Sequence, residues 1–284
     1  MVLIEHVTEK DLEKLKNYGY EKREPKSSKE IVRYRKNATL ILYKNGNLQI
    51  QGRKNRITEA EELIRKILDK PTKKISGEVI GSDESLKGDT FGGIVVAGFK
   101  ADDEIREQLK EIGVKDSKRL LNPDITRIAQ VLIEKFPSNY HVESVFPKEF
   151  NKLNLRYNMT EILDLLHEKC YKKLAKNSKI THVVDLYPNC SVGDIREKEA
   201  ESKYLEVAAA SILARYYALL QIRELEKKAG FFIPLGSSNV ENGLLEIKKK
   251  TLNFEDFVKL KFSNVVEFLN SFEKKYTSKK GKAL

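Results

Sequence analysis

The sequence of 284 residues contains no tryptophan, only two cysteines and only four histidines. Cys170 and Cys190 form no CxxC pair and have no histidine cluster beside them, which indicates ordinary reduced thiols rather than zinc ligands. The histidines stand singly, without a serine or cysteine nucleophile motif. A zinc enzyme and a triad hydrolase are therefore not indicated.

Long apolar runs are also missing. No segment approaches the roughly 20 uninterrupted apolar residues that a membrane span needs. The first residues lack the basic start, apolar run and small-residue site of a signal peptide. Gly88, Gly92 and Gly93 form neither a Walker nor a dinucleotide-binding fingerprint. We therefore expect a cytoplasmic protein that binds no membrane.

The composition fits a globular protein that binds a polyanion. Hydrophobic residues make up 40% of the chain, enough to fill ordinary cores. The formal net charge is +11, and neutralising phosphates with such charge releases condensed counterions. Charged residues make up 33%, with Lys and Glu dominant, which fits adaptation to heat equally well.

The first part of the chain reads as a small α+β unit. Residues 8–17 favour a helix, and residues 38–43 and 48–51 favour two strands. Asn45-Gly46 between them is a hairpin signal. Thr58 could cap a second helix, with Glu61 in the capping-box position. We expect this unit to span residues 1–70, with a polar, proline-containing linker at residues 71–76.

Basic residues surround the predicted hairpin, interleaved with Tyr34 and Tyr43. Such a sheet face could hold phosphates and contact sugars or bases. The alternative is a solvated edge whose charges prevent aggregation. The basic residues are Arg33, Arg35, Lys36, Lys44, Arg53, Lys54 and Arg56.

Residues 77–276 predict a larger α/β domain, because apolar strands alternate there with amphipathic helices. Residues 253–276 also favour a helix, and the Lys-rich residues 277–284 predict a disordered basic tail. The expected strands are residues 77–82, 92–99, 140–145 and 182–185. The expected helices are residues 102–112, 126–135, 159–174 and 204–226.

Acidic residues follow two of these strands. Asp83 and Glu84 end one strand, Asp185 ends another, and Glu201 precedes a small-residue helix that could pack closely on the sheet. Strand ends distant in sequence can converge at one sheet edge. Four hard carboxylates favour Mg²⁺ or Mn²⁺, and a paired-metal site of this kind hydrolyses phosphodiesters. The alternative is that these are unrelated surface acids that cap turns and helices.

Several segments resemble type 2 ribonucleases H, in the same order along the chain. GSDESLKGDTFGGIVVAGF resembles the family's first active-site motif, and GVKDSKRL its DSK segment. VVDLYPN and AESKYLEVAAASILAR are similar to the strand of the third acid and the helix of the fourth. PKEFNKLNLRYN resembles a stretch of the HIII subtype, IPLGSSNV a segment near the C-terminus, and LYKNGNLQIQG the hairpin of the HIII N-terminal domain.

The resemblance implies a ribonuclease H-like catalytic domain, with a mixed sheet and flanking helices, behind a TATA-box-binding-protein-like N-terminal domain. It implies an endonuclease that cuts the RNA strand of RNA–DNA hybrids with two metal ions, leaving 5′-phosphate and 3′-hydroxyl ends. Asp83, Glu84, Asp185 and Glu201 would be the catalytic metal ligands, with Asp83 shared by both ions. Expected substrate contacts are Ser85, Lys87, Gly88, Ser117 and Lys118, with Tyr43, Lys44, Arg53 and Lys54 in the N-terminal domain. We expect a monomer without an obligate protein partner.

Two positions depart from the family pattern. Leu86 stands where the first glycine of a G-x-G stretch is usual, and Gly93 replaces a usual proline, a change that we expect to loosen the chain. These departures motivate an alternative, a catalytically degenerate relative that only binds nucleic acid. The tyrosine-containing motif with which HII enzymes cut at single ribonucleotides has no counterpart around residues 230–239. Cleavage at single ribonucleotides therefore stays open.

Overall fold

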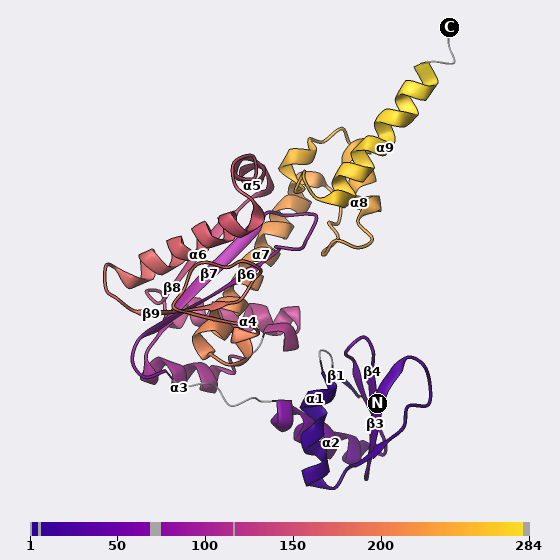
Figure 1. Cartoon of the computed structure of the whole chain (residues 1–284), viewed down its shortest axis with the longest axis vertical. Coiled ribbons are helices and arrows are strands. Elements are labelled where there is room, and N and C mark those ends of the chain that lie inside the picture. Colours follow the sequence, from indigo (N-terminus) through magenta and orange to yellow (C-terminus); the bar gives the residue numbers. More distant parts are fainter. Residues whose placement is uncertain (1, 5–6, 69–74, 116, 281–284) are drawn as a thin grey trace. The chain divides into compact units, whose positions relative to one another are not determined.

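A computed structural model describes residues 2–4, 7–68, 75–115 and 117–280. The chain divides into two compact units, Met1–Thr72 and Lys73–Leu284, which we call the N-terminal and C-terminal units (Figure 1). Each unit has its own hydrophobic core. Most of the predicted linker, residues 71–74, lies outside the described residues.

The N-terminal unit is a five-stranded antiparallel sheet with helices packed on one face. Its strands, in the order β1-β5-β4-β3-β2, are β1 Val2–Ile4, β2 Glu21–Arg23, β3 Glu30–Arg35, β4 Thr39–Tyr43 and β5 Leu48–Gln51. Its helices are α1 Glu9–Leu12, the 3₁₀ helix η1 Glu13–Tyr18 and α2 Lys54–Leu68. Thr8 caps α1 through a capping box with Asp11. The predicted hairpin and first helix are confirmed.

Two details of this unit were predicted wrongly. Tyr34, expected on the nucleic-acid face, is only 1% exposed, because alternation along β3 turns Val32 and Tyr34 into the core. Helix α2 begins at Lys54, and Thr58 lies inside it, with its hydroxyl donating to the Lys54 carbonyl oxygen at 3.2 Å. A threonine can bond to the preceding turn as well as cap a helix.

The C-terminal unit is a mixed five-stranded sheet between helices, with strand order β10-β9-β6-β7-β8. Its strands are β6 Val79–Ser85, β7 Ile94–Ala101, β8 Tyr140–Val145, β9 Thr181–Asp185 and β10 Ile195–Glu197. Its α-helices are α3 Asp103–Ile112, α4 Asn122–Lys135, α5 Pro147–Leu153, α6 Met159–Ala175, α7 Leu205–Ala229, α8 Glu241–Lys249 and α9 Ser263–Lys280. The described residues of this unit also form the short 3₁₀ helices η2 Ser117–Arg119, η3 Ala200–Ser202 and η4 Phe254–Asp256.

Helices α6 and α7 cover opposite faces of this sheet (Figure 1). Alternate side chains of the central strand β6 therefore pack against one helix or the other. Val79 packs with Val207 of α7, whereas Ile80 packs with Leu174 of α6. Gly81 allows α7 to approach closely, because a Cβ there would lie 2.4 Å from the Val207 amide nitrogen. The β6 residues of odd number therefore face α7, and those of even number face α6.

Helix α7 is long and apolar enough to cross a membrane by length and composition alone. In this fold it is a core helix, because most of its residues are buried against β6, β7 and α4. Its small residues, Ala208 to Ala210, allow that close packing. The sequence pattern predicted this helix and its contact with the sheet.

The C-terminal segment differs from prediction. Helix α9 begins at Ser263 rather than at residue 253, because Val258 forms an isolated bridge with Phe91 and breaks the helical run. At its other end α9 continues to Lys280, so residues 277–280 are helical rather than a disordered tail. Lysine is a good helix former, and cations near a helix C-terminus are favourable. Residues 281–284 lie outside the described part of the chain.

Candidate active site

Asp83 and Asp185 lie next to each other at the end of two neighbouring parallel strands. Ser82 of β6 pairs with Val184 of β9, so the next pair in the register is Asp83 and Asp185. Both face α7. Burial, followed by the charges of Glu84 and Asp185, raises the pKa of the Asp83 carboxyl well above its usual value. Burial and the charge of Glu201 raise the pKa of Asp185 to about 6. Carboxylates are therefore crowded at this edge of the sheet, and a bound cation would offset the repulsion between their charges.

Glu201 joins these two acids through η3. The Ala200 amide donates to Asp185 Oδ1 at 2.8 Å, which fixes the start of η3 against the end of β9. Glu201 is 2% exposed, and its Oε1 accepts a hydrogen bond from Lys118 Nζ at 2.5 Å. Its Oε2 is buried without a hydrogen-bond partner among the described residues. A buried carboxylate oxygen in this state is suited to bind a cation.

Lys118 contributes positive charge to the acid cluster. Burial disfavours its ammonium, but the hydrogen bond and charge of Glu201, with the charges of Asp185 and Asp83, raise its pKa. The lysine was predicted to contact substrate phosphates. In the structure its ammonium group instead forms an ion pair with Glu201, although 57% of the side chain remains exposed.

Glu84 faces the opposite side of β6, toward α6. Its Oε2 lies 3.3 Å from Nε2 of His167, and its Oε1 forms an ion pair with Lys87. Burial opposes the charged form, but the bond and charge of His167 outweigh it and, with Lys87, lower the pKa of Glu84. Three of the four predicted acids thus share one face, and the fourth is held charged on the other.

Sequence reasoning missed a buried network behind Glu84. The Ser82 hydroxyl lies 2.7 Å from Nδ1 of His167 and 2.8 Å from Nε2 of His182. Burial lowers the pKa of His182 to about 3, so this ring is neutral. His167 stands on α6, 85 residues after Ser82, and a single histidine on an apolar helix gives no sequence signal of such a contact.

A second missed residue, Ser211 of α7, hydrogen-bonds the Asp83 carboxylate. The Ser117 hydroxyl lies 2.8 Å from that of Ser211, and Ser117 is only 1% exposed. Ser117 was expected to contact substrate. The structure instead directs it inward, to a side chain that orients Asp83, because Arg215 binds its carbonyl oxygen and holds η2 against α7.

The residues of the loop after Glu84 differ in their exposure to solvent. Ser85 and Lys87 are half-buried, and Gly88 is exposed with open space around it. Leu86 is buried and has a left-handed backbone with φ of 65°. A glycine adopts this conformation without cost, which explains why the family pattern has one there.

Gly93 does not loosen the chain, contrary to expectation. A Cβ at this position would lie 1.9 Å from the Val145 carbonyl oxygen. The Gly93 amide also donates to Oε1 of Gln221 at 2.8 Å, a bond that proline could not make. In this chain the position therefore requires glycine.

The carboxylate cluster fits divalent metal ions by its donor chemistry, since it offers hard oxygen ligands, crowded like charges and one unpartnered buried oxygen. Within the described residues, no three acidic, histidine or cysteine side chains already surround a single point as ligands do. Two of the four carboxylates are engaged by Lys118 and Lys87. Oε2 of Glu201 stays without a partner among the described residues beside its ion pair, whereas both oxygens of Glu84 already have partners.

The residues predicted to bind substrate in the N-terminal unit lie on or beside its open sheet face. Tyr43 ends β4 and donates its hydroxyl proton to Gln49 at 2.9 Å on the neighbouring strand. Lys44 follows it, and Arg53 and Lys54 stand at the start of α2; all three are exposed. Lys44 lies at one end of the β4–β5 strand pair, and Arg53 and Lys54 follow its other end; we call these three residues the basic rim.

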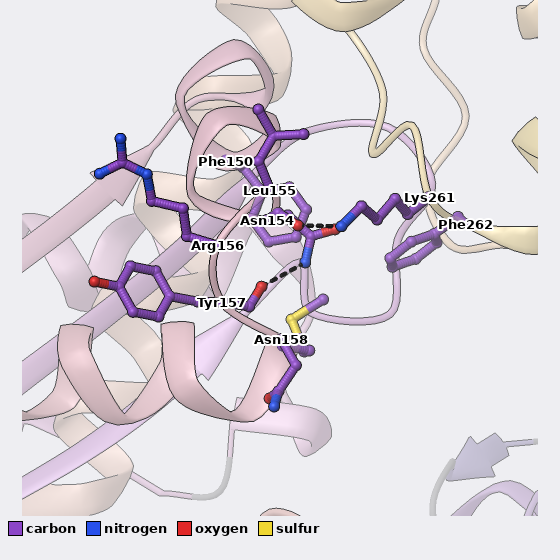
Figure 2. A pocket seen from close by; sticks show the side chains of 9 residues that line it. Phe150, Asn154, Leu155, Arg156, Tyr157, Asn158, Lys261 and Phe262 are labelled. Carbon is purple, nitrogen blue, oxygen red and sulfur yellow. Dashed lines mark hydrogen bonds between the residues drawn. The ribbon is translucent and has the colours of Figure 1, made fainter.

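A separate hollow of about 450 Å³ opens in the C-terminal unit, in the HIII-like stretch after α5. Figure 2 shows Asn154 at its centre, accepting a bond from Lys261 and donating to the Tyr157 carbonyl oxygen at 3.0 Å. Phe150 and Phe262 form part of its wall. None of the four acids lines this hollow.

Comparisons with known proteins show which family the chain resembles. Residues 80–265 match the family model described as Ribonuclease HII. The chain is 32% identical over 273 residues to ribonuclease HIII of Bacillus velezensis, covering 84% of this chain and 86% of that protein. It is 34% identical over 229 residues to ribonuclease HIII of Aquifex aeolicus, covering 78% and 82%.

Solved structures show the same fold. The crystal structure of Bst-RNase HIII in complex with Mn²⁺ has a TM-score of 0.63 at 23% identity, covering 94% of this chain and 97% of that one. The crystal structure of Aquifex aeolicus RNase H3 has a TM-score of 0.54 at 27% identity, covering 91% and 99%. The α/β fold with a mixed sheet is therefore confirmed.

Proposed function

Because the chain belongs to the type 2 ribonuclease H family, in its HIII subtype, we propose that it is an endoribonuclease that hydrolyses the RNA strand of RNA–DNA hybrids. The products are 5′-phosphate and 3′-hydroxyl ends. The observation that carries this proposal is the cluster of Asp83, Asp185 and Glu201 on one sheet edge, where the two aspartates have raised pKa values and Oε2 of Glu201 has no hydrogen-bond partner among the described residues.

The enzyme uses Mg²⁺ or Mn²⁺, which, when bound, activate the attacking water and stabilise the leaving oxygen. Asp83, Glu84, Asp185 and Glu201 would hold the ions. Ser211, supported by Ser117, orients the Asp83 carboxylate, and His167 keeps Glu84 charged. Lys118 and Lys87 would then turn from their acids toward the phosphates of the substrate.

We assign substrate contacts to the loop of Ser85, Lys87 and Gly88, beside the acids. Gly88 is exposed, and among the described residues no hydrogen bond uses the backbone amides of Lys87 and Gly88. Backbone amides of this kind can bind a phosphate or a 2′-hydroxyl oxygen. A 2′-hydroxyl distinguishes the RNA strand from DNA.

The N-terminal unit, residues 1–70 in the sequence-based division, is proposed as a TATA-box-binding-protein-like domain that binds the hybrid. Support comes from its antiparallel sheet, whose one face is covered by α1 and α2 while the other carries Tyr43 and Gln49. Lys44, Arg53 and Lys54 would contact phosphates. The remaining proposals are a catalytic domain at residues 77–276, a cytoplasmic location, and a monomer with no obligate protein partner.

The alternative of a degenerate binding protein loses its motivation. It depended on Leu86 and Gly93, but Leu86 keeps the left-handed backbone that a glycine would adopt, and the packing around Gly93 requires glycine. All four acids are present.

The test is cleavage of end-labelled duplexes in Mg²⁺ and in Mn²⁺. The panel compares an RNA–DNA hybrid, double-stranded RNA, double-stranded DNA, and DNA with a single ribonucleotide. Cleavage of the hybrid alone supports the proposal, and added cleavage at the single ribonucleotide would broaden the substrate class. Tight hybrid binding with no cleavage of any duplex would instead identify the degenerate binding protein.

A further inference from the structure

The loop at residues 86–92, which follows the first two acids, is held from inside by a lysine from a distant segment. Lys259 is fully buried, and its Nζ donates to the carbonyl oxygens of Leu86 at 2.8 Å, Asp89 at 2.6 Å and Gly92 at 3.0 Å. Three carbonyl acceptors match the three protons of an ammonium group. The lysine therefore fills the concave side of the loop.

The ammonium group of Lys259 is buried among aromatic rings. Its Nζ lies 5.7 Å from the ring centre of Phe150 and 5.2 Å from that of Phe262, the two rings that also line the hollow in Figure 2. Burial lowers the pKa of Lys259 to about 7, and the charge of Asp89 opposes this shift. An ammonium group is costly to bury unless its donors are used, and here the loop uses all three.

The segment that carries Lys259 also binds the loop through its backbone. Phe91 forms a bridge with Val258, and the Gly92 amide donates to the Phe257 carbonyl oxygen at 3.0 Å. The Lys259 amide donates to the Thr90 carbonyl oxygen at 3.1 Å. The loop thus depends on residues about 170 positions later in the chain for its shape.

The conformation most in need of support is that of Leu86. A non-glycine residue with φ of 65° is disfavoured by contact between its Cβ and its own backbone. Lys259 binds the carbonyl oxygen of this residue, and the Leu86 side chain is buried in the core. The left-handed turn directs the chain into Lys87 and Gly88, whose amides we assign to the substrate.

We propose that Lys259 is a positioning residue for hybrid cleavage, which holds residues 86–92 in the shape that presents the amides of Lys87 and Gly88 to the RNA strand. The lysine touches neither the acids nor the substrate, and it acts only through the loop. It replaces the conformational freedom that the family obtains from glycine at the position of Leu86. This inference rests on the proposed function.

The test is a graded series at position 259 in the full chain. Lys259→Gln retains two donors and Lys259→Met retains none, and Lys261→Met is the matched control, since Lys261 donates to Asn154 and not to the loop. We expect kcat on a hybrid to fall in the order of donors lost, by about 10- to 100-fold for K259M. K261M should cleave within about twofold of the wild type, the range of an ordinary surface substitution.

Two further readouts separate positioning from folding. Thermal unfolding is measured for each variant, and kinetics are run well below the lowest midpoint. The series is repeated with Leu86→Gly, where the left-handed turn no longer needs support. The loss caused by K259M should be several times smaller in that background.

Each outcome decides the proposal. It is overturned if folded K259Q and K259M both cleave like the wild type, or if L86G leaves the loss unchanged. If K259M does not fold, K259Q and its pairing with L86G give the answer. A wild-type chain that cuts no hybrid removes the proposed function and this inference together, whereas normal wild-type cleavage with normal variants removes only the inference.

Discussion

Single residues at this site are held by partners that lie far away in sequence. Asp83 is oriented by Ser211, Glu84 by His167, and Glu201 by Lys118. The acids themselves could be singled out from the sequence, because three of them follow apolar strands and all four match family motifs. Their partners could not, because an isolated serine or histidine on an apolar helix resembles an ordinary core residue.

Replacing Asp83 or Asp185 by Asn should abolish hybrid cleavage, with a loss of at least about 100-fold, because neither amide can provide the charge that a metal ion needs. Hybrid binding in EDTA should stay close to that of the wild type. In the same buffer the variants should be at least as stable as the wild type, since the exchange removes a buried like charge. Substantial turnover at saturating Mg²⁺ would reject these assignments.

The neutral state of His182 predicts a loss of stability in acid. Its folded pKa of about 3 lies below the usual 6.5, so the unfolded chain binds the proton more readily. The contribution of His182 is complete above pH 6.5 and is lost as the pH falls toward 3. Between pH 7 and pH 5 the loss is about 2 kcal/mol.

Urea unfolding of the wild type and of His182→Gln, at pH 7 and at pH 5, measures this loss. Glutamine cannot titrate but can still hydrogen-bond the Ser82 hydroxyl. The variant should be less stable at pH 7 and should lose less stability between the two values. Equal losses in both proteins would show that other groups cause the acid sensitivity.

At the scale of elements, local patterns predicted the long helices and the strands β6 to β9 well, with ends shifted by a few residues. They failed where tertiary contacts prevail over local preference. The run from residue 253 looks helical, yet Val258 pairs with Phe91 and Lys259 is drawn into the core. Strands β1, β2 and β3 were missed because their short, charged sequences become strands only beside the predicted hairpin.

Close packing where β7, β8 and α7 meet predicts that Gly93 cannot be replaced without a loss of stability. Gly93→Pro, which restores the residue usual in the family, should destabilise the C-terminal unit by about 3 kcal/mol or more, because it loses the bond to Gln221 and overlaps the Val145 carbonyl. Gly52→Ala is the control, since its added Cβ meets only ordinary contacts at 3.6 Å. Thermal unfolding of both variants is the measurement, and a G93P protein as stable as the wild type would contradict this packing.

At the scale of the whole molecule, the net charge of +11 gives the chain a general attraction for polyanions, and we propose that the two units have different roles. In the proposed division, the N-terminal unit provides affinity and the C-terminal unit provides chemistry. The net charge favours binding to polyanions in general but does not name the partner. It could not separate a binding rim from charge that serves solubility, because both look alike in one sequence.

A triple variant of Lys44, Arg53 and Lys54 to Gln should bind hybrid more weakly. Its slope of log K against log salt should fall by up to about 2.7, if each residue neutralises one phosphate. The matched control changes Lys10, Lys14 and Lys16, exposed on the helices that cover the other sheet face, and should keep the wild-type slope. Equal slopes for all three proteins would place the binding rim elsewhere.

The dependence of the loop on Lys259 also has a consequence during protein synthesis. Asp83 and Glu84 leave the ribosome long before the residue that shapes the loop beside them, which follows Leu86 by 173 positions. At the usual elongation rate of about 5–20 residues per second, this delay is roughly 10 to 35 seconds. A nascent chain would thus expose its first acids to cellular RNA for that time without a finished site, and its loop would reach the shape for full activity only once translation has passed Lys259.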